Sequence, residues 1–367
     1  MALRNTSSAS VTLPLQTGSS DDWREIATGF EFSNYTYRTL SACFILAITP
    51  IGVIGNSMVI IAVCLSRKLQ TKTNLFVINL ASLDLLNCAF FPVQVTMLLH
   101  RGSSPPRLGP LCPIAGAIVI TTNVGSVVTL AVIAVTRCVK IIKSGSAYHR
   151  LFTRKVLACM IAVCWCYPIL TMVVPRVAGL GSLGYSNRYK LCLWSDEQQY
   201  QIYMSMMLSL SFILAFGIIT VCYVTIVVFV RIKSRKVAPR RREQVFHISV
   251  QQEDTGNSAQ SENAQQGKQQ RGKPVNAREI KVTQNLAIVI CTFFLCIMPY
   301  GVCTLIPGSY VPFICLSHLL LFNSIINPFI YAMKHPVFSQ VFRCIFTCSL
   351  RSIPEPTREL RSVLNMT

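Results

Sequence analysis

Charged residues are scarce in this chain. Only 13% of its 367 residues are Asp, Glu, Lys or Arg, whereas 52% are hydrophobic. Soluble domains ordinarily carry about 25% charged residues, so a chain of this length with so few does not have an ordinary water-facing surface. A run of roughly 20 apolar residues suffices for a helix to cross a bilayer, and several such runs are present. The composition therefore indicates an integral membrane protein.

Acidic residues are scarcer than basic ones. The chain has 14 Asp and Glu against 34 Lys and Arg, which gives a formal net charge of +20. In a soluble protein this excess would suggest a nucleic-acid partner. In a membrane protein, Lys and Arg collect on cytoplasmic loops and set the orientation of the spans. We therefore expect the lipid bilayer, and no nucleic acid, as the partner of this basic sequence.

Several functional motifs are missing from the sequence. It has no cysteine pairs or Cys/His cluster with zinc spacing, and no Gly-x-Ser-x-Gly or His-Glu-x-x-His. It also lacks the internal repeat that marks many transporters, and residues 1–39 lack the apolar core of a cleavable signal peptide. These absences predict that the chain is not an enzyme. They leave a multi-span transporter or channel as one class of membrane protein to be considered.

The apolar runs predict an all-α membrane protein with a seven-helix bundle over residues 40–333. The predicted spans are 40–65, 74–99, 110–139, 154–175, 202–231, 280–306 and 311–333. Apolar side chains recur at helical spacing after Pro336, which predicts a short amphipathic helix on the membrane surface within residues 334–348. Residues 238–276, between the fifth and sixth spans, and the tail 349–367 are poor in large apolar residues, so we expect both to be disordered.

Loop charge predicts the orientation of the bundle. Basic residues concentrate in the first, third and fifth links, which share one side of the membrane. The positive-inside rule then places the N-terminus outside and the C-terminus in the cytosol, and we expect a multi-pass protein of the plasma membrane. Asn5 and Asn34 head Asn-x-Ser/Thr sequons, so they are candidate glycosylation sites on the outer segment.

Four cysteines and one acid stand apart from the apolar background. Cys112 and Cys192 would both face the oxidising side, which favours a disulfide over two free thiols. Cys344 and Cys348 are juxtamembrane candidates for palmitoylation, with unmodified cysteines as the equal alternative. Asp84 lies well inside the second span, where a carboxylate is costly and usually functional.

Motifs in order along the chain resemble the rhodopsin-like (class A) G-protein-coupled receptors from about Leu40 to Phe346. They are Gly55-Asn56, the Asn79-to-Asp84 segment, Cys112, Arg137, Trp165, Cys296-Ile297-Met298-Pro299 and Asn327-Pro328-Phe329-Ile330-Tyr331. The segment Pro175-Arg176-Val177-Ala178-Gly179 loosely resembles melatonin-receptor-like and orphan members. The resemblance implies a signalling receptor whose partners are a heterotrimeric G protein, an arrestin and a receptor kinase.

The resemblance also implies roles for individual residues. Asp84, Ser126, Asn323 and Asn327 match a sodium pocket, so a sodium ion is the one expected cofactor. Arg137 would face the G protein when active and pair with Glu279 when inactive, while Pro299, Pro328 and Tyr331 belong to the helices that move. The sequence departs from the family at Thr136 and Cys138, which flank Arg137, at Ile297 in place of a tryptophan, and at Ala215 in place of a proline.

The expected ligand is neutral or lipophilic. Val119 stands where amine receptors of the family carry an aspartate, and Leu321 stands where opsins carry the retinal lysine. The matching pocket is mostly apolar or uncharged; its positions are Val119, Asn123, Met207, Ile297, Tyr300, Ser317 and Leu321.

Overall fold

The structure, a computed structural model, describes most of the chain. The described residues are 34–101, 109–143, 145–186, 190–194, 198–254, 284, 287–299 and 313–365. Glu279, Tyr300 and Asn5 lie outside them, and Ser317 is described only in its backbone. The predictions that concern these four side chains are therefore not addressed by the structure.

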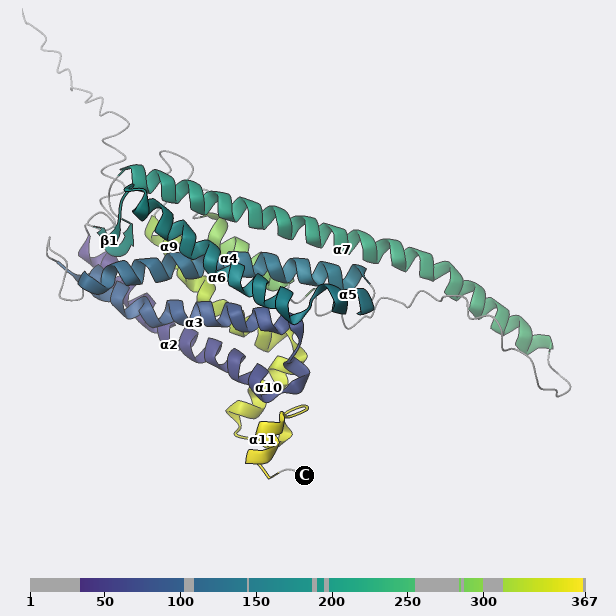
Figure 1. Cartoon of the computed structure of the whole chain (residues 1–367). Coiled ribbons are helices and arrows are strands. Elements are labelled where there is room, and N and C mark those ends of the chain that lie inside the picture. The colour runs from purple at the N-terminus through teal and green to yellow at the C-terminus, as the bar shows by residue number, and fades with distance from the viewer. Residues whose placement is uncertain are drawn as a thin grey trace, which may run out of the picture.

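Long helices run side by side and form one bundle (Figure 1). Their bounds are α2 (Tyr35–Leu65), α3 (Lys72–Leu99), α4 (Cys112–Ile142), α6 (Arg154–Val177), α7 (Gln198–Asp254), a helix over Ala287–Pro299, and α9 (Phe313–Lys334). In the described residues, α2, α3, α4, α6 and the part of α7 over Ile202–Lys233 are long and apolar enough to cross a membrane. All backbone groups of a helix bond internally, which is the condition for crossing hydrocarbon.

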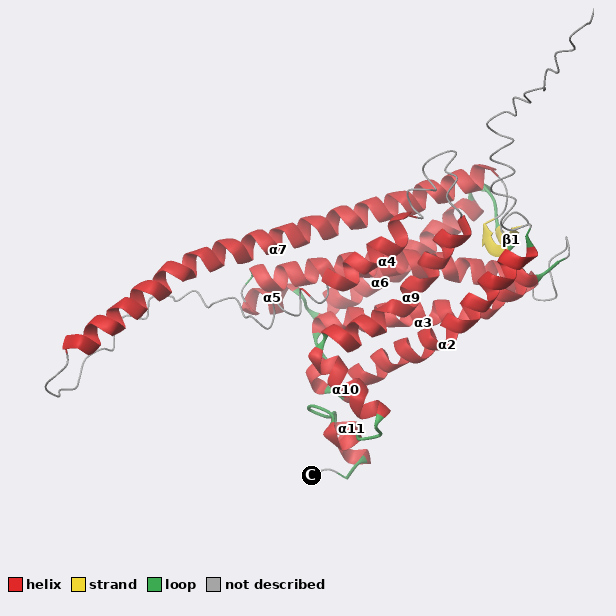
Figure 2. Ribbon diagram, turned by 180° about the vertical axis from the view of Figure 1, so that it is seen from behind, coloured by secondary structure: helices red, strands yellow, loops and turns green. Residues whose placement is uncertain are grey.

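Shorter elements connect and cover the bundle. The η1 turn (Arg67–Leu69) joins α2 to α3, η2 (Gly109–Leu111) precedes α4, and α5 (Gly145–Leu151) joins α4 to α6. Strands β1 (Leu183–Ser186) and β2 (Leu191–Trp194) pair antiparallel in the link before α7. This hairpin lies at the end of the bundle opposite α10 (Figure 2). The loop that carries Cys192 is therefore an ordered cover at that end.

Helix α4 is the centre of the bundle. Buried residues make up 78% of its most apolar stretch, against 28% for α6 and 22% for α7. Small residues allow this close packing: a Cβ on Gly125 would lie 3.1 Å from the carbonyl oxygen of Cys164 and 3.2 Å from the side chain of Leu83. Close backbone approach at small residues is how membrane helices associate. Side chains of α4 therefore meet those of α3, α6 and α7.

The predicted amphipathic helix is present as α10 (Pro336–Phe346). His335 caps its N-terminus by accepting a hydrogen bond at Nδ1 from Phe338 N, and Pro336 occupies the first turn. Val337, Phe338, Val341 and Phe342 are buried on one face, whereas Phe346 is 72% exposed. Its apolar face therefore packs against the bundle.

The structure differs from the predicted disorder at two places. Helix α7 continues to Asp254, so residues 238–254 are helical, while 255–276 lie outside the described residues. The segment after Pro239 is rich in Arg, Gln and Glu, which are good helix formers. The tail also folds, with η3 (Leu350–Ser352) and α11 (Arg358–Val363), because Ile353 and Leu360 find partners on the bundle.

Candidate ligand and switch sites

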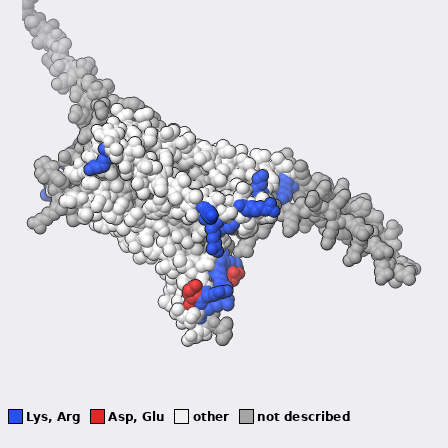
Figure 3. Space-filling view, viewed as in Figure 1, with Lys and Arg blue, Asp and Glu red and all other residues white. Residues whose placement is uncertain are grey.

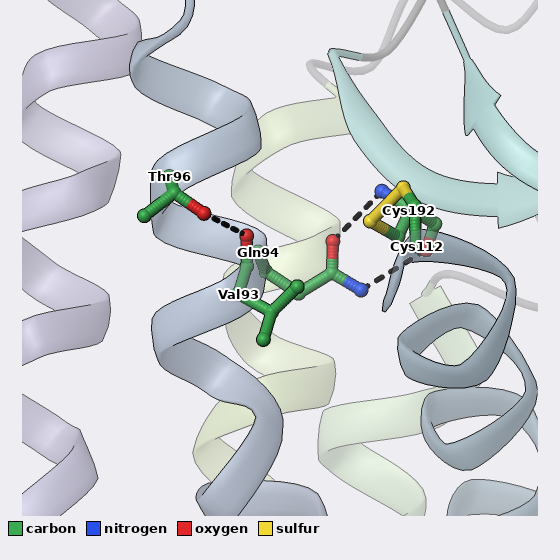
Figure 4. The surroundings of a disulfide bond; sticks show 5 residues. All are labelled: Val93, Gln94, Thr96, Cys112 and Cys192. Atoms are coloured by element: carbon green, nitrogen blue, oxygen red, sulfur yellow. Dashed lines mark hydrogen bonds between the residues drawn. A yellow bond between two sulfur atoms is a disulfide. The ribbon is translucent and has the colours of Figure 1, made fainter. Parts of the chain in front are cut away.

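A disulfide and one glutamine fix the hairpin to the bundle (Figure 4). Cys112 at the start of α4 bonds to Cys192 in β2, as predicted, with a Cα–Cα distance of 5.0 Å. The amide of Gln94 in α3 bonds twice to Cys192: Nε2 donates to the carbonyl oxygen at 3.0 Å, and Oε1 accepts from the backbone N–H at 2.8 Å. Sequence analysis did not identify Gln94, because a lone amide in an apolar helix carries no pattern.

The hairpin lies directly on α4. A Cβ added to Gly116 would lie 3.2 Å from the carbonyl oxygen of Leu193. Tyr185 lies on β1. Burial raises the pKa of its hydroxyl, and the nearby positive charge of Arg38 lowers that pKa to a smaller extent. The Tyr185 hydroxyl therefore stays neutral and forms part of a packed cover over this end of α4.

The bundle centre holds a polar cluster around Asp84. This carboxylate is 1% exposed and accepts a hydrogen bond of 2.9 Å at Oδ2 from Nδ2 of Asn327. Ser126, on α4, is also 1% exposed, and Asn323, on α9, equally so. The predicted polar residues of α3, α4 and α9 are therefore all buried in the bundle, and we call them the polar layer.

Three further residues, Asn56, Asn87 and Ser324, belong to this cluster and were missed as site residues. Asn87 Nδ2 donates to Ser324 Oγ at 3.0 Å, and Ser324 also hydrogen-bonds Asp84. Asn56 Nδ2 donates to the carbonyl oxygens of Gly52 at 2.9 Å and Ser324 at 2.8 Å. The signal available in the sequence was a polar side chain one helical turn after Asp84, at Asn87.

Several polar atoms in this layer lack a partner within the described part of the chain. They are Oδ1 of Asn56, Asn87 and Asn327, both amide atoms of Asn323, and the Tyr331 hydroxyl. A buried polar group without a hydrogen bond costs free energy unless water or an ion satisfies it. Carbonyl and carboxylate oxygens suit a hard cation. The donor set therefore fits a sodium ion or ordered water.

Arg137 lies at the other end of α4, near the expected inner mouth. Its side chain is only 4% exposed, and its neighbour Thr136 is buried with its hydroxyl bonded to the Ile133 carbonyl oxygen at 2.8 Å. The phenol of Tyr223 on α7 is close enough to interact with the Arg137 charge. Sequence analysis did not single out Tyr223, and the predicted pair with Glu279 lies outside the described residues.

The predicted ligand-pocket residues differ in exposure. Val119 and Asn123 on α4 are buried, as is Ile297 of the helix Ala287–Pro299. The Asn123 amide donates to the Val119 carbonyl oxygen at 2.7 Å, within its own helix. Met207 on α7 and Leu321 on α9 are half-buried. Ile297 packs in the main core cluster of the bundle.

A second network ties α3, α4 and α6 together. Trp165 Nε1 donates to Asn79 Oδ1 at 2.8 Å, and Asn79 Nδ2 donates to Thr129 Oγ1 at 2.8 Å. The Thr129 hydroxyl in turn donates a hydrogen bond to the Gly125 carbonyl oxygen at 2.7 Å. Every polar atom of the Asn79 side chain is thus used, which fixes the register of three helices.

The predicted modification sites lie at the helix ends. Asn34 caps α2, with its Oδ1 accepting from Thr36 N at 2.9 Å. Cys344 is 7% exposed and packs in the core, whereas Cys348 is exposed. Of the two palmitoylation candidates, only Cys348 presents its thiol to a modifying enzyme. Both kinds of modification stay predictions.

Basic surface gathers at one end of the molecule. In Figure 3, most of the Lys and Arg surface in view lies at the end that carries α5, α10 and α11. This is the end at which the first and third links lie (Figures 1 and 2). The distribution agrees with the charge asymmetry that predicted the orientation.

Comparison with known proteins shows the class to which this architecture is similar. The family model "7 transmembrane receptor (rhodopsin family)" matches residues 55–331, more than half of the chain. The alpha-1D adrenergic receptor of Homo sapiens is 26% identical over 330 residues, covering 84% of this chain and 56% of that receptor. The melatonin receptor type 1A-A of Danio rerio is 30% identical over 209 residues, covering 56% of this chain and 58% of that receptor.

A solved structure agrees with the fold. The crystal structure of squid rhodopsin matches with a TM-score of 0.65 and 21% identity, covering 90% of each chain. The chain spans little more than half the length of the two curated relatives. The named matches are receptors and a photoreceptor pigment, not enzymes, and they give no support to a transporter or channel.

Proposed function

This chain belongs to the rhodopsin family of seven-transmembrane receptors, and on that premise we propose that it binds a neutral or lipophilic small ligand from outside and activates a heterotrimeric G protein. In such a receptor, the ligand shifts an equilibrium between two arrangements of the helices. The further partners would be an arrestin and a receptor kinase. The expected location is the plasma membrane, with the N-terminus outside.

The observation that supports this proposal most is the buried bond between Asp84 and Asn327. It joins α3 to α9 through a carboxylate that is 1% exposed. A carboxylate inside a membrane is retained at considerable cost, and around it lie polar atoms without partners in the described residues. Such a layer can be rearranged without breaking the apolar packing, which is what a helix switch requires.

Val119 on α4 supports a neutral ligand. One relative is named for an adrenergic ligand, a charged amine, and another for melatonin, which is uncharged. A charged amine buried in a pocket needs a carboxylate partner. Val119 stands at the position of that carboxylate and is 8% exposed. The pocket chemistry is therefore closer to what melatonin requires.

A sodium ion is proposed for the polar layer. Asp84, Ser126, Asn323 and Asn327 would hold it with oxygen atoms, and Ser324 and Asn87 would orient them. The ion would supply positive charge beside Asp84 and stabilise the arrangement of α3 and α9 that it binds.

The inner end would engage the G protein through Arg137. Its guanidinium sits in a largely buried position next to α7 and would become available when the helices separate. In the inactive state we expect it to pair with Glu279; a partly buried pair of this kind contributes more than a solvated one. If Glu279→Ala left basal signalling unchanged, this pairing would be wrong.

The proposal is tested with the purified chain in nanodiscs. Guanine-nucleotide exchange is measured on each class of heterotrimeric G protein, without ligand and with melatonin or adrenaline as probes. Exchange that depends on the chain and is lost in Arg137→Ala supports the receptor function. Exchange identical to empty nanodiscs with every G protein and both probes counts against it. Stimulation by adrenaline alone would contradict the neutral ligand.

A further inference from the structure

The C-terminal segment 350–364, here the tail clasp, lies against one corner of the bundle. The corner consists of residues 65–69, which are the end of α2, Ser66 and η1, and of α10. In both ribbon views α11 lies beyond α10, at the corner where α2 ends and away from α7 (Figures 1 and 2). The contacts are therefore made with the first link and α10, and not with the side of the bundle formed by α7.

Backbone hydrogen bonds attach the clasp to the first link. Arg67 N donates to the Glu355 carbonyl oxygen at 2.9 Å, and Thr357 N donates to the Leu65 carbonyl oxygen at 3.0 Å. Ser66 and Pro356 face each other as an isolated antiparallel bridge. The clasp thus pairs with the link as an added strand, the mode by which extended peptides bind exposed edges.

Side chains complete this attachment. Ser66 is fully buried and donates from Oγ to the Pro354 carbonyl oxygen at 2.6 Å. Ile353 is 3% exposed and Leu360 is 7% exposed, and both belong to the same core cluster as Leu69 and Phe342. Two apolar anchors therefore flank the paired stretch, one on each side.

The conformation of the clasp depends on this docking. Glu355 has φ 47, in the left-handed region that side chains other than glycine rarely adopt. It lies between Pro354 and Pro356, which restrict the backbone before docking. A non-glycine residue persists in this region only where surrounding contacts impose it. The pairing of Glu355 with Arg67 N is such a contact.

We propose that the tail clasp is an internal peptide ligand of this corner, and that the chain exchanges between a docked state and a released state in which the tail is free for cytosolic proteins. Few contacts hold the clasp, and segments held by few contacts open locally without unfolding the domain. Release would expose Leu69 and the paired backbone groups of Leu65 and Arg67, and would free a peptide carrying Arg351, Arg358 and Arg361. The inference requires neither a ligand nor a G protein.

The docked state is tested by cross-linking. In a Cys64→Ser, Cys348→Ser background, Ser66→Cys is combined with Pro356→Cys, and a site for a sequence-specific protease is inserted within residues 255–283. After mild oxidation and cleavage, the two fragments should remain joined on a non-reducing gel. The matched control combines Ser66→Cys with Val363→Cys, because Val363 is 78% exposed on α11. Equal cross-linking of both pairs, or of neither, would overturn the docking.

The released state is tested by proteolysis of the full chain in nanodiscs. A Glu-specific protease should cut slowly after Glu359 in α11, since the adjoining Leu360 is buried against the bundle. Ile353→Asp and Leu360→Gln should each speed this cleavage at least about tenfold, because cleavage of an opened segment follows its population. Val363→Asp is the control and should cleave like the unchanged chain. Fast cleavage of the unchanged chain, or equal acceleration by Val363→Asp, would contradict the clasp.

Discussion

Asn327 and Asp84 lie 243 positions apart in the chain and are joined by a hydrogen bond of 2.9 Å in the centre of the bundle. The bond links α9, which carries the Asn-Pro segment before Tyr331, to α3. Because Pro328 follows Asn327 directly and removes a backbone hydrogen bond from α9, the side-chain bond lies at the weakest point of that helix. A substitution at Asp84 should therefore alter the conformation of α9.

The first prediction concerns sodium. Asp84→Asn removes the only carboxylate of the proposed ion site but keeps its size and its hydrogen bonding to Asn327. Sodium should raise the thermal unfolding temperature of the unchanged chain relative to the larger N-methyl-glucamine cation, by linkage between binding and stability. We expect this difference to vanish in Asp84→Asn, measured in detergent at fixed ionic strength.

Ser82→Ala is the matched control for this experiment. Ser82 lies on the same helix, and within the described residues its hydroxyl bonds only to the carbonyl oxygen of Ile78 in its own helix. Its sodium response should equal that of the unchanged chain. A sodium effect that persists undiminished in Asp84→Asn would rule out the ion site.

The second prediction concerns the hairpin. Gln94→Leu keeps an apolar side chain of similar length and removes both bonds to Cys192. Leaving a buried donor and acceptor unpaired costs about 1–3 kcal/mol, so the unfolding temperature should fall, and hydrogen exchange at the Cys192 amide should become faster. Thermal unfolding and exchange mass spectrometry measure the two effects.

Thr96→Val is the control for Gln94→Leu. Thr96 lies on the exposed side of α3, and in the part of the chain that the structure describes its hydroxyl bonds only to the Val93 carbonyl oxygen of its own helix, at 2.8 Å (Figure 4). It should leave exchange at Cys192 unchanged. Equal exchange at Cys192 in the unchanged chain and in Gln94→Leu would show that the disulfide alone holds the hairpin.

The spans were predictable because bilayer thickness fixes helix length and the bilayer permits few other structures. The disulfide was predictable because topology placed Cys112 and Cys192 on the oxidising side. The partners of Asp84 followed from ordered motifs, but the bonds of Ser324 and Asn87 depend on how α3 and α9 rotate against each other. The spacing of apolar residues along the sequence does not indicate that rotation.

The clasp was missed for a different physical reason. Ile353 and Leu360 are isolated apolar residues in a polar, proline-containing tail, which by composition resembles a disordered segment. Their burial depends on a corner built by residues far away in the chain, namely Leu69 and the buried face of α10. The extension of α7 beyond Lys233 was missed for a local reason instead. Helix propensity there outweighed the polar composition.

The third prediction concerns the network around Asn79. Trp165→Phe keeps the ring in place but removes the bond from Nε1 to Asn79 Oδ1. Hydrogen bonds between membrane helices average about 0.6 kcal/mol in double-mutant cycles, so we expect only a small loss of stability. The cycle with Asn79→Ala should show a coupling of this size, whereas additive effects would mean that Trp165 acts through packing alone.

The last prediction concerns the contact between α4 and α6. Gly125→Leu places a side chain where the first added carbon already lies 3.1 Å from the backbone of Cys164. The backbone cannot give way as a flexible side chain would, so α6 must move outward, at a typical cost of about 1–3 kcal/mol for overpacking. We expect a lower unfolding temperature and slower folding into nanodiscs.

Gly217→Leu is the control, because Gly217 on α7 has no atom within 4 Å of an added Cβ and sits on an exposed surface. If both substitutions lowered the unfolding temperature equally, contact with α6 would not explain the effect, and the close packing at Gly125 would not be a determinant of the bundle.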